Sequence, residues 1–242
     1  MTDWTHDDKF AFTGPLHEGG TATHDIYVKG NGPPIVILQE LPGIGPETLA
    51  LVDRLAGRGF RGYLAHFLGP FGRKSFVGNT LRVLCIRREF HAFARGRESP
   101  IGTWFRALVA EVSSREAGAM VGVVGMCLTG GFALALMAEP SVIGGVASQP
   151  SLPLMAGDAL HMTDAQIAQA RDGMAEKGPG LAMRYSGDSM STARHMAALN
   201  AAFGPHLESV EFQGRQHALL TLHFHEPAYQ KMEDYFVHRL AL

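Results

Sequence analysis

Cysteine is scarce in this sequence, which has only Cys85 and Cys127 among 242 residues. Two cysteines exclude a disulfide framework, so we expect a reducing, cytoplasmic location. No apolar run reaches the length of a membrane span, and the first ten residues carry acids instead of the apolar core of a signal peptide. We therefore expect no membrane association. In a reducing compartment a cysteine is either inert packing or chemically active.

The sequence also has no large excess of positive or of negative charge. The 21 lysines and arginines and 23 aspartates and glutamates are mixed along the chain and give a formal net charge of -2. Without a basic stripe, nucleic acid is not an expected partner. The expected partner is a small molecule, and the expected assembly is a monomer or a small homo-oligomer.

Strand-like and helix-like segments alternate along the chain. We expect strands at 24–30, 35–39, 60–67, 120–125, 142–149, 181–187 and 207–214. We expect helices at 46–59, 80–93, 104–117, 132–139, 162–178, 191–204 and 226–240. This order predicts an α/β fold with a mostly parallel sheet covered on both faces. No linker divides the chain, so residues 1–242 are interpreted as one domain, with the basic, glycine-rich stretch 71–102 as an insertion or cap.

The stretch VVGMCLTGG, residues 123–131, carries the clearest chemical signal. A strand followed by glycine, any residue, a nucleophile and a helix is the layout of a nucleophile elbow. Cys127 occupies the nucleophile position, and the amide of Leu128 begins the following helix, where it can bind an oxyanion. The alternative is that Cys127 is a small buried hydrophobe. Cys85 lies in an apolar helical stretch and is interpreted as packing.

A cysteine nucleophile needs a base and an orienting acid, in the chain order nucleophile, acid, histidine. Asp188 directly follows the strand at 181–187 and is the candidate acid, although it could instead cap the next helix. His217 follows the last strand and is the candidate base, with His223 and His225 as rivals. The remaining acids and histidines in this part of the chain suit capping or packing, namely Asp158, Asp164, His195 and His206.

One more acid stands at a strand end. Glu40 follows the buried strand at 35–39, at the edge where functional groups gather in open α/β sheets. The adjoining amide of Leu41 is suited to be a second oxyanion donor. The alternative is that Glu40 is a solvated loop residue.

These motifs together resemble the dienelactone hydrolase family, a cysteine-using branch of the α/β-hydrolase fold. The similarity runs from about Gly30 to the C-terminus, and its anchors are VILQELPGIG, VGMCLTGGFALA, YSGDSMS and GRQHALL. The resemblance implies a triad of Cys127, Asp188 and His217 and a carboxylic ester hydrolase of the carboxymethylenebutenolidase type. It also implies that Glu40 holds the thiol neutral until substrate arrives and that Leu41 and Leu128 supply oxyanion amides. We expect no cofactor and no metal.

The sequence departs from the family pattern in three places. Thr129 stands where glycine is usual, and Gln216 instead of glycine precedes His217. No basic residue lies at 218–221, where the family has an arginine; Arg82, Arg87 or Arg88 could supply the family's other arginine. The substrate is therefore expected to be a different ester, lactone or thioester.

Three alternatives stay open at this point. The first is a thioesterase or acyl transferase of the same fold, and the second is a catalytically inactive protein that binds a small ligand. The third is a metal site at LTLHFHEP, where His223, His225 and Glu226 on a strand could share one face.

Overall fold

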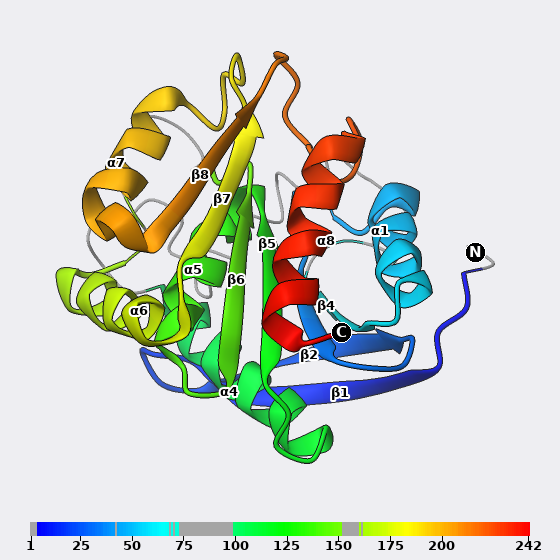
Figure 1. The fold of residues 1–242 in the computed structure, drawn as a ribbon. Helices are drawn as coiled ribbons and strands as arrows, with labels where there is room; N and C mark the ends of the chain where they lie inside the picture. Colours follow the sequence, from blue (N-terminus) through cyan, green and yellow to red (C-terminus); the bar gives the residue numbers. More distant parts are fainter. Residues whose placement is uncertain are drawn as a thin grey trace.

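The computed structural model describes residues 4–41, 43–67, 69, 71–72, 99–151, 160 and 162–242. Its centre is an eight-stranded sheet with the strand order β1-β2-β4-β3-β5-β6-β7-β8 (Figure 1). The strands are β1 (Asp8–Pro15), β2 (Thr21–Lys29), β3 (Pro34–Leu38), β4 (Arg61–His66), β5 (Val121–Met126), β6 (Val142–Ser148), β7 (Gly180–Tyr185) and β8 (Leu207–Phe212). The two pairs β1–β2 and β2–β4 are antiparallel, and the other neighbours are parallel.

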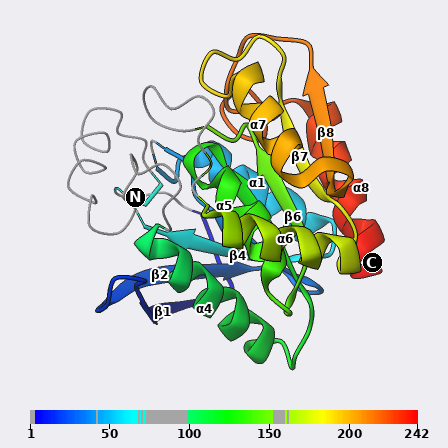
Figure 2. The same cartoon turned by 90° about the vertical axis from the view of Figure 1, so that its left-hand side faces the viewer.

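Helices cover both faces of this sheet. The α-helices are α1 (Pro46–Gly57), α4 (Pro100–Arg115), α5 (Gly130–Ala135), α6 (Asp164–Lys177), α7 (Ala193–Phe203) and α8 (Glu226–Leu240). Helices α1 and α8 lie on one face (Figure 1), and α4, α5, α6 and α7 lie on the other, with α4 beside β1 and β2 (Figure 2). The predicted α/β-hydrolase architecture, a mostly parallel sheet between two helical layers, is confirmed.

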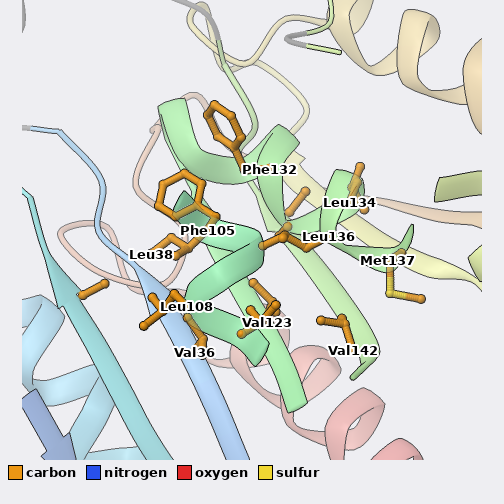
Figure 3. Close-up of a cluster of buried hydrophobic side chains, with 14 of the residues drawn as sticks. Val36, Leu38, Phe105, Leu108, Val123, Phe132, Leu134, Leu136, Met137 and Val142 are labelled. Carbon is orange, nitrogen blue, oxygen red and sulfur yellow. The ribbon is translucent and has the colours of Figure 1, made fainter. Parts of the chain in front are cut away.

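Burial follows from this layering. Every residue of β3 and β5 is buried, as expected for central strands covered on both faces. The side chains of successive strand residues belong alternately to two apolar cores. One core contains Val36, Leu38 and Val123 and packs on α4 and α5. The other contains Ile35, Ile37 and Val124 and packs on α1 and α8. Figure 3 shows Phe105 and Leu108 of α4 packed with Phe132 of α5 over β3 and β5. These two cores hold the carboxyl ends of β3, β5, β6 and β7 along one edge.

The predicted elements are largely confirmed, with shifts at their ends. Helix α4 begins at Pro100, four residues before the predicted start, so the end of the proposed insertion 71–102 belongs to this helix. The predicted helix at 132–139 is instead α5 followed by a 3-10 turn, Leu136–Ala138. The predicted helix at 80–93, and Cys85 within it, lie outside the described residues.

One strand was missing from the sequence prediction. Strand β1 pairs along its whole length with β2 and forms the edge of the sheet. Its residues are mostly exposed or half-buried, so they lack the apolar run that marked the inner strands. Within the described part of the chain, no helix is both long and apolar enough to cross a bilayer.

Candidate active site

Cys127 sits on a sharp turn between β5 and α5. Its φ is +53°, a left-handed conformation that is unusual for any residue other than glycine. The side chain is 4% exposed and is a free thiol. Strand, strained residue and helix in immediate succession are the geometry of a nucleophile elbow, so the local arrangement predicted from VVGMCLTGG is present.

The elbow is crowded, and two glycines make it possible. A side-chain carbon at Gly125 would lie 2.2 Å from the carbonyl oxygen of Thr129, and one at Gly130 would lie 2.9 Å from Pro150. Glycine at these two positions lets the turn close and lets the segment after β6 pack against α5. By contrast, nothing lies within 4 Å of a side-chain carbon built at Gly131.

Thr129, which departs from the family pattern, is accommodated by hydrogen bonds. Its Oγ1 accepts from the backbone N–H of Met126 at 2.9 Å. Its own proton is within reach of the carbonyl oxygens of Leu38 at 3.1 Å and Met126 at 2.9 Å. The backbone at Thr129 has φ -90° and ψ -4°, which a residue with a side chain adopts readily. Thr129 therefore links the elbow to the end of β3 by a hydrogen bond, and its backbone leaves the elbow undistorted.

Asp188 and His217 lie together, as the sequence predicted. Asp188 Oδ2 is 2.7 Å from His217 Nδ1, while its Oδ1 accepts from the backbone N–H groups of Met190 at 2.8 Å and Ser191 at 3.1 Å. The helix that Asp188 could have capped is capped instead by Thr192. One carboxylate oxygen thus anchors the loop after β7, and the other fixes the orientation of the imidazole ring.

The second ring nitrogen of His217 faces the cysteine. Nε2 is buried, without a hydrogen bond of ordinary geometry among the described residues, but Cys127 is near enough to affect its protonation. Burial alone lowers the pKa of His217, whereas hydrogen bonding to Asp188 and Cys127 and their negative charges raise it. The net effect raises the pKa to about 10. This environment favours an imidazolium beside negatively charged neighbours.

Glu40 is buried at the end of β3 and is held by side chains from two other loops. Gln149 Nε2 donates to its Oε2 at 3.0 Å, and the hydroxyl of Thr221 donates to its Oε1. The solvated alternative for Glu40 is therefore wrong, because the residue is only 2% exposed. Two donors aimed at the two oxygens suit an ionised carboxylate. The proposed action of Glu40 on the thiol stays a prediction.

Gln149 connects three loops at this edge of the sheet. It was placed in the strand predicted at 142–149, but β6 ends at Ser148 and Gln149 has a φ of +36°. Its backbone N–H donates to Met183 O at 2.6 Å, and its Oε1 accepts from the backbone N–H of Leu219 at 3.3 Å. Among the described residues four non-glycine positions have a positive φ, and two of them, Cys127 and Gln149, are at this site.

The two predicted oxyanion donors follow directly after Glu40 and Cys127 in the chain. Leu128 is the residue after Cys127 and is buried in the short 3-10 turn Cys127–Thr129. Leu41 belongs to the turn that closes with Gly43 N–H donating to Glu40 O at 2.9 Å. Their donation to an oxyanion stays a prediction.

The rival histidines are not arranged as a metal site. Residues 219–223 form turns, and no residue from 218 to 225 is in a strand, so the predicted strand is wrong. His223 N–H donates to Ala218 O, and His225 N–H donates to Leu219 O. The side chain of His223 accepts from the backbone N–H of Ala218 at 3.3 Å. In the ranges that the structure describes, no group of three histidine, cysteine, aspartate or glutamate side chains could hold a metal ion.

A small pocket adjoins the elbow. It is lined by Leu128, Gly131, Ser151, Leu160, Met162, His195 and Leu199. His195 is 4% exposed, its Nδ1 has no hydrogen-bond partner, and burial lowers its pKa to about 4. His195 is thus a neutral packing residue in the wall of this pocket, in line with its interpretation from sequence.

The chain matches a known protein family over most of its length. The model of the dienelactone hydrolase family matches residues 22–217, which include Glu40, Cys127, Asp188 and His217. The chain belongs to the dienelactone hydrolase family. No curated protein sequence matches this member of the dienelactone hydrolase family.

Solved structures similar to this dienelactone hydrolase family member share its fold at low sequence identity. An esterase of Pyrococcus furiosus has a TM-score of 0.63 at 12% identity, with 96% of this chain and 93% of that chain covered. A cold-adapted esterase from an Arctic intertidal metagenomic library has a TM-score of 0.63 at 15% identity, with 99% and 100% covered. A dienelactone hydrolase-like promiscuous phosphotriesterase from metagenomic libraries has a TM-score of 0.62 at 14% identity, with 96% and 98% covered.

Proposed function

We propose that this protein hydrolyses a carboxylic ester or lactone through an acyl-cysteine intermediate. The observation that carries the proposal is the combination at one sheet edge of a strained, buried thiol with a histidine that Asp188 orients at 2.7 Å. Family membership and the esterases among the similar structures support the same reaction class. Its expected setting is the cytoplasm, without a cofactor.

The proposed first half-reaction transfers the acyl group to sulfur. The Cys127 thiolate attacks the acyl carbon and forms a carbon–sulfur bond, while the carbonyl oxygen becomes an oxyanion. The amides of Leu41 and Leu128 stabilise that oxyanion by on the order of 3 kcal/mol per donor. The tetrahedral intermediate then expels the alkoxide, which takes the proton from Nε2 of His217. Asp188 keeps Nδ1 protonated and the ring in place.

The second half-reaction releases the acid. His217, now neutral, accepts a proton from water, and the resulting hydroxide attacks the thioester carbon. Collapse of this intermediate breaks the carbon–sulfur bond and returns the thiolate beside the imidazolium. Because a thiolate leaves more readily than an alkoxide, sulfur suits substrates whose own leaving group is good. Enol lactones and activated aryl esters are therefore the proposed substrate class.

The test compares wild type with Cys127→Ala on p-nitrophenyl esters, lactones and thioesters. Loss of the nucleophile should lower kcat by at least about a thousandfold, because triad members act as a unit. Mass spectrometry of the wild type during turnover should detect an acyl group on Cys127. Equal rates for the two proteins would refute the proposal, whereas transfer of the acyl group to an added alcohol would identify an acyl transferase.

A further inference from the structure

Ser151, in the segment after β6, places its hydroxyl against the sulfur of Cys127. The distance between Ser151 Oγ and Cys127 Sγ is 3.1 Å, and each residue is 4% exposed. Within the described parts of the chain, Cys127 is the only hydrogen-bond partner of this hydroxyl. The hydroxyl proton is therefore not shared with a second acceptor there, and burial strengthens the hydrogen bond electrostatically.

The position of Ser151 is fixed by three contacts with the rest of the site. Its backbone N–H donates to Cys127 O at 3.1 Å. The preceding carbonyl, Pro150 O, accepts from the hydroxyl of Ser191 at 2.8 Å, and Ser191 N–H also holds Asp188. Pro150 packs directly on Gly130 of α5. The segment that carries the hydroxyl is thereby tied to both the nucleophile and the loop of the acid.

We propose that Ser151 is a further catalytic residue, which donates its hydroxyl proton to the Cys127 thiolate. The inference rests on the proposed role of Cys127 as nucleophile. A thiolate has no proton to give, so the hydroxyl is the donor whenever the sulfur is charged. The sulfur thus receives this hydrogen bond from Ser151, while the imidazolium of His217 lies beside it. A hydrogen bond to an ionised partner is roughly twice as strong as one between neutral groups, so it favours the thiolate over the thiol. It thereby opposes the effect predicted for Glu40, which would hold the thiol neutral.

The same hydrogen bond acts at the end of the cycle. The sulfur of a thioester carries no charge and is a weak acceptor, so the bond to Ser151 weakens during acylation. It strengthens again as the carbon–sulfur bond breaks and charge returns to the sulfur. Ser151 therefore assists departure of the thiolate, and its loss should lower the deacylation rate as well as the population of reactive thiolate.

The test measures alkylation of Cys127 by iodoacetamide from pH 5 to pH 10, quantified on the peptide that contains this residue. For Ser151→Ala we expect the rate at pH 6 to fall on the order of tenfold, and the midpoint of the pH profile to rise by about one pH unit. Ser151→Thr, which keeps the hydroxyl, should restore most of the wild-type profile. A Ser151→Ala profile that coincides with the wild type would overturn the inference.

A matched control separates this effect from general loss of a buried hydroxyl. Ser113 donates to Ala119 O at 2.8 Å near the end of α4, just before β5 begins, whereas Cys127 follows the other end of that strand. Ser113→Ala should leave the alkylation profile unchanged. If it shifts the profile as much as Ser151→Ala does, the proposed direct bond to sulfur is refuted.

Alkylation needs no substrate, so the two proposals can fail separately. If Cys127→Ala is inactive and the Ser151→Ala profile is unshifted, the role of Ser151 is refuted and the proposed hydrolase function is supported. If Cys127→Ala is active and the Ser151→Ala profile is shifted, the acyl-cysteine mechanism is refuted and the hydrogen bond from Ser151 to the sulfur is supported.

Discussion

The hydroxyl group of Thr129 has a structural role, although this residue departs from the family pattern. Thr129 is 1% exposed, and its Oγ1 satisfies the N–H of Met126 while reaching the carbonyl oxygen of Leu38. These bonds connect the strand before the nucleophile with the neighbouring strand. The hydroxyl therefore contributes to the rigidity that a strained turn at Cys127 requires.

Replacing this hydroxyl with a methyl group isolates its contribution. Thr129→Val keeps the shape but leaves the buried N–H of Met126 without its acceptor, which should cost about 1–3 kcal/mol of the free energy of unfolding. Urea denaturation measures this loss. Thr129→Ser, which retains the oxygen, should lose distinctly less. Equal losses for the two variants would show that the hydroxyl is not the stabilising group.

The sequence predicts the residues that follow the known chain order of a catalytic triad. It does not predict residues whose role depends on which loops meet at the sheet edge. Cys127, Asp188 and His217 were found because a nucleophile, an acid and a base recur after successive strands. Ser151, Gln149 and Thr221 gave no such signal, since serine, glutamine and threonine are common in loops. Their roles depend on which loops meet at the sheet edge, and local spacing does not determine that.

At the scale of elements, the short helix α5 is shaped by what packs against each of its first two residues. Gly130 faces Pro150 at a distance that excludes a side chain, whereas Gly131 faces open space. The two adjacent glycines of the motif therefore have different reasons to be present. The first maintains contact between the elbow and the segment of Ser151.

Alanine substitution at each glycine tests this difference. Gly131→Ala should raise the free energy of unfolding by up to about 1 kcal/mol, because alanine favours a helix over glycine. Gly130→Ala should lower both stability and activity, since Pro150 must move and Ser151 with it. Thermal unfolding and ester hydrolysis measure the pair. A stabilised Gly130→Ala variant would contradict the described packing.

The positions of helices and strands could be predicted where their burial produces a recognisable pattern of apolar residues in the sequence. The inner strands appear as apolar runs and the helices have amphipathic spacing, so their centres were located from sequence. The strand β1 was missed because it is an edge strand whose pairing with β2, not its own burial, stabilises it. The end of β6 was misplaced by one residue because the turn at Gln149 is imposed by contacts with Met183 and Leu219.

For the whole molecule, the charge state of His217 links the site to stability. Its pKa is raised to about 10 in the folded protein, against 6.5 ordinarily. Between these values the folded protein holds a proton that the unfolded chain releases. The stabilisation is therefore complete below about pH 6.5 and is lost as the pH rises toward 10.

Thermal unfolding from pH 6.5 to pH 9.5 should reveal this linkage. The melting temperature of the wild type should exceed that of His217→Gln most at pH 6.5, and the difference should shrink as the pH rises. His6→Gln, at an exposed position, is the control and should follow the wild type. A difference that grows with pH would show that the imidazolium is not stabilised in the folded state.

The loops that meet at the sheet edge come from widely separated parts of the chain, with Glu40 at one extreme and Thr221 at the other. Such contacts form late during folding, because closing long loops costs entropy before any contact compensates for it. The site is consequently a reporter of completed folding. Activity should return on refolding only with the last kinetic phase, after most of the helical signal, and no fragment that ends before His217 can carry it.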